Sequence, residues 1–242
     1  MERIWIKGDH RQEMAEHRKK GDIKEWYGVI AGTPVDTRMG VDNLIERGFA
    51  AVGLAASATP HEQARLQILD PQALTELVLE LIRELETVGV DGIWIYCNSM
   101  CGAVNLSYLR EKSTVPVVTP LDVYLELAEE YRTLGIIAAN NQSLAGIERT
   151  LQTGSPHCWG IGAALLPVVL EIEAETPAGE IISRFKLAGI LEAMKAMGSE
   201  ALVLGCTHFP YMKKELEELG ILPVIDPADR MAAMLQFGRQ QE

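Results

Sequence analysis

Short apolar segments alternate with longer amphipathic stretches from residue 26 to the end of the chain. The short segments are bounded by Gly, Pro or Asp, which is typical of buried strands, and the longer stretches repeat apolar residues at helical spacing. Parallel strands need a crossover between them, and a helix supplies it. The sequence therefore predicts an α/β fold built from parallel sheets. The expected strands cover residues 26–31, 49–55, 92–96, 115–119, 134–138, 163–170, 201–204 and 222–225.

Signals for helix ends occur between these strands. Asp70 precedes Pro71, which suits an N-cap followed by a proline in the first helical turn, and Gly89 ends the apolar repeat that follows. Gly198 ends a second amphipathic stretch in the same way. The expected helices cover residues 71–88, 177–197 and 210–219, and a last helix begins at Pro227.

The two halves of the chain resemble each other. A helix-ending glycine, a strand and a cysteine follow one another at the same spacing in each half, as Gly89 and Cys97 and as Gly198 and Cys206. Any two βαβ units share some of these features, so one interpretation is an ordinary run of such units. The alternative is two similar lobes that each present a cysteine at the carboxyl end of a strand, where open α/β sheets bind ligands.

The composition argues against several classes of protein. Apolar residues make up 48% of the 242 residues and charged residues 23%, a globular balance. Lys and Arg number 22 against 34 Asp and Glu, and the formal charge of −12 repels a phosphate backbone. We therefore expect no nucleic-acid partner, and we expect no membrane span because Pro167 interrupts the longest apolar run. Four cysteines are too few for a disulfide scaffold, and no secretory signal is visible, so a cytoplasmic location is expected.

Cys97 and Cys206 each end a run of strand residues and precede small polar side chains. A single cysteine is usually a small buried hydrophobe. A thiol at a strand-to-helix junction, however, faces backbone N–H groups and the positive end of a helix dipole, and both favour the thiolate. Two such thiols facing one cleft can act as a base on one side of a carbon atom and as an acid on the other. That arrangement inverts a stereocentre.

The residues around both cysteines resemble the paired signatures of the aspartate/glutamate racemase superfamily. These are Tyr96-Cys97-Asn98-Ser99 and the run from Leu204 to Pro210, which is especially similar to the Gly-Cys-Thr-His-Phe-Pro run of glutamate racemases. The resemblance covers roughly residues 26–242. It implies an amino-acid racemase that uses neither pyridoxal phosphate nor a metal, with an acidic amino acid as the expected substrate.

The resemblance also implies two pseudosymmetric lobes, each a parallel sheet flanked by helices, with the active site in the cleft between them. The expected division is a polar N-terminal extension of residues 1–25, a first lobe of residues 26–118 plus 219–242, and a second lobe of residues 119–218. A homodimer is possible.

Individual roles carry over at the matching positions. Cys97 and Cys206 would be the two acid–base thiols, and His208 would assist the proton traffic of Cys206. The residues expected to bind the substrate are Thr33, Asn98, Ser99 and Thr207.

The chain departs from the glutamate racemase pattern at two assisting positions. Where those enzymes place an Asp-Ser pair after the first strand, this chain has Ala31-Gly32-Thr33, and its nearest acid, Asp36, comes later. Where they carry a Glu three residues after a strand proline, this chain has Leu170, followed by Glu171. Arg65 could hold a substrate carboxylate, as an arginine does in aspartate racemases, or could be a solvated helix residue.

Three other interpretations remain open. The same thiols could racemise another carbon acid, such as a hydantoin. A zinc module could use Cys97, Cys101, Cys206 and His208, since sulfur and imidazole ligands hold zinc tetrahedrally. The two-lobed fold could also serve as an amino-acid sensor without catalysis.

Overall fold

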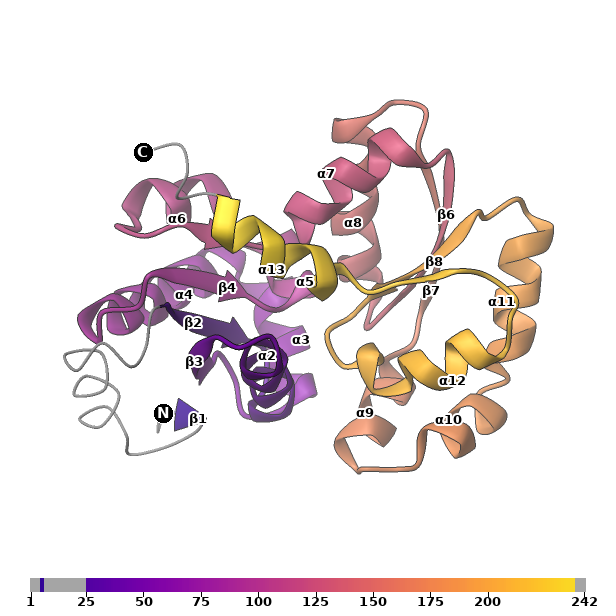
Figure 1. The fold of residues 1–242 in the computed structure, drawn as a ribbon, viewed down its shortest axis with the longest axis horizontal. Helices are drawn as coiled ribbons and strands as arrows, with labels where there is room; N and C mark the ends of the chain where they lie inside the picture. The colour runs from indigo at the N-terminus through magenta and orange to yellow at the C-terminus, as the bar shows by residue number, and fades with distance from the viewer. Residues whose placement is uncertain (1–4, 7–24, 238–242) are drawn as a thin grey trace.

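The computed structural model describes residues 5–6 and 25–237, which form two sheets flanked by helices (Figure 1). The first sheet has the order β1-β3-β2-β4-β5, in which β1 runs antiparallel to β3 and the other strands run parallel. Its strands are β1 (Trp5–Ile6), β2 (Trp26–Ala31), β3 (Ala50–Ala55), β4 (Gly92–Ile95) and β5 (Val117–Val118). Of the expected N-terminal extension, residues 1–25, only β1 and residue 25 are among the described residues.

The second sheet is wholly parallel and has the order β7-β6-β8-β9. Its strands are β6 (Thr133–Ala138), β7 (Trp159–Ala164), β8 (Ala201–Gly205) and β9 (Val224–Ile225). The parallel strands of both sheets therefore follow the same order along the chain, with the second strand at one edge. The prediction of an α/β fold with two similar parallel sheets flanked by helices is confirmed.

Helices cover these sheets and connect their strands (Figure 1). Those of the first half are α2 (Pro34–Glu46), α3 (Pro60–Leu69), α4 (Pro71–Thr87), α5 (Asn98–Ala103) and α6 (Leu106–Lys112). Those that follow are α7 (Pro120–Glu130), α8 (Asn141–Gly154), α9 (Leu166–Glu173), α10 (Ala178–Arg184), α11 (Leu187–Ala196), the 3₁₀ turn η1 (Phe209–Met212), α12 (Lys213–Glu218) and α13 (Pro227–Phe237).

Two glycines end corresponding helices in the two halves. Gly89 follows α4 and Gly198 follows α11, with φ angles of 83° and 100° that a side chain would strain. The strands after these glycines, β4 and β8, are the third parallel strands of their sheets along the chain, and a cysteine follows the end of each within two residues. The similar spacing in the sequence thus corresponds to equivalent places in two sheets of the same topology.

The prediction of a strand over residues 163–170 is wrong, because that segment is the end of β7 followed by helix α9. Pro167 stands in the first turn of α9, where its missing N–H costs nothing, whereas inside a strand it would break the ladder. Val168, Val169 and Ile172 are the buried residues of α9, at helical spacing.

The expected helix over residues 177–197 is divided into α10 and α11. Lys186, with a φ of 54°, separates the two helices. The chain also stays with the second sheet beyond residue 219, since β9 pairs with β8 before α13 packs against α7.

One hydrophobic cluster joins the two sheets. It contains Tyr27 and Trp94 from the first sheet, Ala138 and Val203 from the second, and Met231 from α13, all of them buried. Two further clusters lie on the outer faces of the two sheets. The sheets therefore share a packed interior, which fixes the carboxyl ends of their strands relative to each other. Among the helices described, none is long and apolar enough to cross a membrane.

Helices α5 and α8 cross at two glycines. A Cβ atom added to Gly146 would lie 2.9 Å from the Cα atom of Gly102, closer than packed atoms allow. We expect Gly146→Ala to destabilise the protein by about 1–3 kcal/mol through this overlap. Gly189→Ala in α11 is the matched control, because its Cβ meets nothing within 4 Å and should stabilise the helix slightly. Urea unfolding of both variants measures the difference, and equal effects would contradict the close crossing.

Candidate active site

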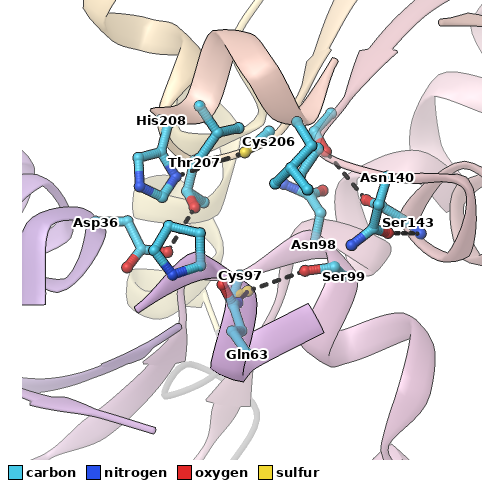
Figure 2. A pocket seen from close by; sticks show the side chains of 15 residues that line it. Asp36, Gln63, Cys97, Asn98, Ser99, Asn140, Ser143, Cys206, Thr207 and His208 are labelled. Carbon is cyan, nitrogen blue, oxygen red and sulfur yellow. Dashed lines mark hydrogen bonds between the residues drawn. The ribbon is translucent and has the colours of Figure 1, made fainter. Parts of the chain in front are cut away.

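Cys97 lies two residues after the end of β4 and Cys206 directly follows β8, and both side chains line one pocket (Figure 2). Because β4 and β8 belong to different sheets, each sheet contributes one thiol. Figure 2 shows the two sulfur atoms approaching the pocket from opposite sides. The two cysteines that the sequence singled out are thus brought to one site.

The pocket is lined by both halves of the chain and is small. About 10 Å³ is open to a water-sized sphere, roughly enough for a single water molecule. An amino acid is larger than this space, so the side chains that line the pocket must move before it can enter. The lining residues are Asp36, Pro60, Gln63, Cys97, Asn98, Ser99, Ala139, Asn140, Ser143, Leu166, Val169, Gly205, Cys206, Thr207 and His208.

On one side of the pocket, a chain of polar contacts begins at Cys206. Its Sγ lies 3.6 Å from Nδ1 of His208, and Nε2 of the same ring lies 2.9 Å from Oε1 of Glu173. The hydroxyl of Thr33 lies 2.7 Å from the same carboxylate oxygen. The imidazole is therefore held between a thiol and a carboxylate, which is the geometry of a proton carrier with a fixed orientation.

These contacts keep His208 protonated. Burial alone would lower the pKa of His208, but its hydrogen bonds with Cys206 and Glu173 outweigh burial and raise that pKa well above its ordinary value. Burial likewise opposes the charge on Glu173, yet the hydrogen bonds from His208 and Thr33 leave the pKa of Glu173 lowered. Both shifts favour the charged pair, an imidazolium beside a carboxylate.

The raised pKa of His208 predicts how stability depends on pH. The imidazolium stabilises the folded protein fully below the unfolded pKa of about 6.5, and this contribution is lost as pH rises through the folded pKa. The difference in unfolding free energy between wild type and His208→Gln should therefore shrink from pH 6 to pH 9. Urea titrations at several pH values measure it, and a difference that grows with pH would contradict the assignment.

The surroundings of Cys97 are neutral hydrogen-bonding groups. Nε2 of Gln63 donates to its Sγ at 2.8 Å, and Oγ of Ser99 lies 3.5 Å from it. Gln67 in turn donates to Oγ of Ser99 at 2.9 Å, and Asn140 contacts Gln67 from the other sheet. Burial, with a contribution from Asp36, raises the pKa of Cys97 to about 12, while Ser99 counteracts this.

Asp36 joins the two halves beside the pocket. Its carboxylate accepts hydrogen bonds from the backbone N–H groups of Gly32 and Thr33, and from the hydroxyl of Thr207 in the other half at 3.1 Å. Burial raises the pKa of Asp36, and the nearby His208 and the hydrogen bonds from Thr33 and Gly32 lower it in part. Asp36 thus holds the end of β2 against the loop that carries Cys206.

Asn98 is also held in place. The hydroxyl of Tyr124, on α7, donates a hydrogen bond to Oδ1 of Asn98, and both side chains are buried. This hydrogen bond orients the amide, and its NH₂ group can donate to a ligand.

Six of the seven site residues expected from the sequence line the pocket. The exception is Thr33, which lies behind it as the N-cap of α2 and contacts Glu173. Arg65 is exposed on α3 and does not line the pocket. Glu171 pairs with Arg184. The residues that line the pocket as expected are Cys97, Asn98, Ser99, Cys206, Thr207 and His208.

Sequence reasoning missed Glu173, Gln63 and Tyr124. The wrong prediction of a strand over residues 163–170 hid Glu173, because that segment belongs largely to α9, which runs on to Glu173 and brings it to His208. Gln63 and Tyr124 carry no local signal, since their partners lie far away in the sequence. A helix starting at Thr59-Pro60, typical N-cap and first-turn residues, would have brought Gln63 into consideration.

The zinc interpretation finds no support in the geometry. Among the described residues, no group of three or more His, Cys, Asp and Glu side chains is arranged to hold a metal ion. Cys101 points its Sγ at the carbonyl oxygen of Ile95, 3.6 Å away. All four cysteines are described, and all four are free thiols.

Comparison with curated proteins finds glutamate racemases. One from Deinococcus radiodurans is 26% identical over 147 residues, covering 57% of this chain and 49% of the relative, and one from Shewanella woodyi is 30% identical, covering 60% and 56%. The chain thus spans about half the length of these curated relatives.

Solved structures share the fold over more of the chain. Glutamate racemase from Francisella tularensis in complex with D-glutamate has a TM-score of 0.68 at 18% identity, covering 90% of this chain and 81% of that one. Aspartate racemase from Picrophilus torridus has 0.65 at 14% identity, covering 88% and 93%, and allantoin racemase from Klebsiella pneumoniae has 0.62 at 22%, covering 88% and 86%. The family model described as Asp/Glu/Hydantoin racemase matches residues 36–235. The chain, with its paired cysteines on two similar sheets, belongs to this Asp/Glu/Hydantoin racemase family.

Proposed function

We propose that the protein interconverts the two enantiomers of an amino acid, with Cys97 and Cys206 as acid–base groups on opposite faces of Cα and without a cofactor. The observation that carries this proposal is that one thiol from each sheet borders the same pocket, from opposite sides. Membership in a racemase family supports it.

In the proposed reaction, one proton leaves one face of Cα and one proton is delivered to the opposite face. One cysteine, as a thiolate, takes the hydrogen of Cα as a proton and leaves the electron pair on the carbon. The other cysteine, as a thiol, donates its proton to the opposite face and becomes a thiolate. The resemblance to glutamate racemases assigns the L enantiomer to Cys206. The imidazolium of His208 then stabilises the Cys206 thiolate before abstraction. Because the imidazolium already carries a proton on both ring nitrogens, the proton taken from Cα stays on Cys206.

An acidic amino acid, glutamate or aspartate, is the first candidate substrate. The amide of Asn98 and the hydroxyls of Ser99 and Thr207 line the pocket and can bind a carboxylate. The curated relatives are glutamate racemases, and the shared fold extends to an aspartate racemase.

A neutral carbon acid of the hydantoin type is the second candidate. Neither lysine nor arginine occurs among the described residues that line the pocket, so no long cationic side chain is present for a second carboxylate. Gln63 and Asn140 offer amide groups instead, which suit a ureide.

A chiral assay tests these proposals directly. Purified protein is incubated with each enantiomer of glutamate, aspartate and allantoin, and the opposite enantiomer is quantified by chiral chromatography. We expect conversion of glutamate or aspartate in both directions, and none with the Cys97→Ala/Cys206→Ala double variant. Conversion of allantoin alone would favour the second candidate, and conversion by the double variant would refute the two-thiol mechanism.

We extend the proposal to the location of the protein in the cell and to its oligomeric state. We place the protein in the cytoplasm, because four free thiols suit a reducing compartment. A homodimer is proposed as well, and light scattering of the purified protein tests it.

A further inference from the structure

Gln63 contacts Cys97 although the helix that carries Gln63 and the strand that leads to Cys97 are not neighbours in the sequence. Gln63 lies on α3, and its Nε2 donates to Sγ at 2.8 Å, within the pocket. This contact is shorter than the 3.5 Å between the same sulfur and Oγ of Ser99. A residue in direct contact with the reacting atom is placed to affect its chemistry.

Gly32 makes room for this contact. A Cβ atom added at Gly32 would lie 1.8 Å from Nε2 of Gln63 and 2.1 Å from its Cδ. Any side chain at position 32 would therefore displace the Gln63 amide from its place beside the sulfur. The contact between Gln63 and Cys97 therefore depends on the glycine after β2 as well as on the glutamine on α3.

The groups around Cys97 can donate hydrogen bonds to a thiolate without adding charge. A thiolate has no hydrogen to donate, so Ser99 must donate to it, and Gln67 leaves the Ser99 hydrogen free by donating to the Ser99 oxygen. The side-chain amide of Gln63 supplies a second donor. Burial and the charge of Asp36 both oppose the thiolate, and the hydrogen bonds from Ser99 and from the backbone N–H of Met100 favour it. The geometry adds the Gln63 amide to these donors, at 2.8 Å from the sulfur.

We propose that Gln63 is a catalytic residue for the Cys97 half of the reaction: its amide donates a hydrogen bond to Sγ of Cys97 and stabilises the thiolate when the sulfur holds no proton. The role differs from that of His208, which is charged and lies beside Cys206. The two halves of the site thus stabilise their thiolates differently, Cys97 by neutral donors and Cys206 by a cation. The inference rests on the proposed two-thiol function.

Alkylation of the individual cysteines tests the contact without any substrate. Wild type, Gln63→Leu and Gly32→Ala are treated with iodoacetamide between pH 7 and 9, and the modification of each cysteine is followed by peptide mass spectrometry. Leu keeps the bulk of Gln63 and removes the donor, whereas Gly32→Ala keeps the donor and displaces it. Gln72→Leu, at an exposed position on α4, is the matched control.

Loss of the donor should slow the alkylation of Cys97 in both variants. A hydrogen bond to a charged group shifts a pKa by about one to two units, and the higher nucleophilicity of a more basic thiolate offsets about half of the lost thiolate. We therefore expect a rate about 3–10-fold lower at Cys97 and an unchanged rate at Cys206. An unchanged rate at Cys97, or an equal fall at Cys206, would overturn the proposal.

A second measurement separates this proposal from the proposed function. If wild type racemises an amino acid in the chiral assay, Gln63→Leu should lower kcat/KM about tenfold, and Gln72→Leu should not. Wild-type activity with an unaltered kcat/KM in Gln63→Leu would contradict the role of Gln63 and leave the two-thiol mechanism standing. Absence of any racemisation by wild type would contradict the function, while the alkylation rates would still report the hydrogen bond.

Discussion

Replacing Cys97 or Cys206 with Ala should lower racemisation by several orders of magnitude. Inversion requires a base on one face of Cα and an acid on the other, so neither thiol can act alone. The loss should exceed the roughly 10²–10⁴-fold that one general acid or base supplies, because the remaining thiol has no partner for the second proton transfer. Chiral chromatography of each single variant measures it, and Cys101→Ala, which removes a buried thiol outside the pocket, is the control.

The two variants should differ when only one proton transfer is needed. Elimination of chloride from β-chloroalanine requires abstraction of the Cα hydrogen and no return of a proton. Each single variant should therefore retain elimination with one enantiomer, and the two should prefer opposite enantiomers. Cys97→Ala should keep elimination from the L form, because Cys206 is assigned to it. The same preference in both variants would mean that one cysteine is merely structural.

Glu173→Gln should slow the Cys206 half of the reaction about 100-fold, at the lower end of the range for general acid–base catalysis. The substitution keeps the shape of the side chain and removes the negative charge that faces Nε2 of His208. Without that charge the buried imidazolium loses its ionic partner, so the pKa of His208 falls and the Cys206 thiolate loses the cation beside it. Elimination from β-chloro-L-alanine measures this step alone.

Glu171→Gln is the matched control for this prediction. Glu171 lies on the same helix, α9, but pairs with Arg184 and does not line the pocket. Its substitution should leave elimination from both enantiomers unchanged. Equal slowing of both enantiomers by Glu173→Gln would indicate a general disturbance of the pocket and would contradict a role confined to Cys206.

The sequence predicted the sheets well because buried parallel strands are short apolar runs with clear ends. The glycines at 89 and 198 marked the helix ends, and the strand after each one led to a cysteine, so equivalent positions in the two sheets could be inferred. The prediction of a strand over residues 163–170 was wrong because an apolar run of that length fits either a strand or a buried helix. Pro167 favours the helix, since a proline inside a strand removes a ladder hydrogen bond.

The site could be predicted only in part, for a physical reason. Cys97, Cys206 and His208 stand in local motifs that can be read from the chain. Glu173 and Gln63 contact His208 and Cys97 from elements that are distant in the sequence. The position of α3 and α9 against the strand ends depends on how the two sheets pack. No local pattern encodes such a contact.

Racemisation in D₂O, followed by ¹H NMR and chiral analysis, tests the two-thiol mechanism most directly. One thiolate removes the Cα hydrogen, and the opposite thiol, already exchanged with solvent, delivers deuterium to the other face. During the initial phase, the product enantiomer should therefore carry deuterium at Cα while the remaining substrate keeps its hydrogen. A product that retains the original hydrogen, or a substrate that exchanges as fast as it racemises, would contradict two facing thiols.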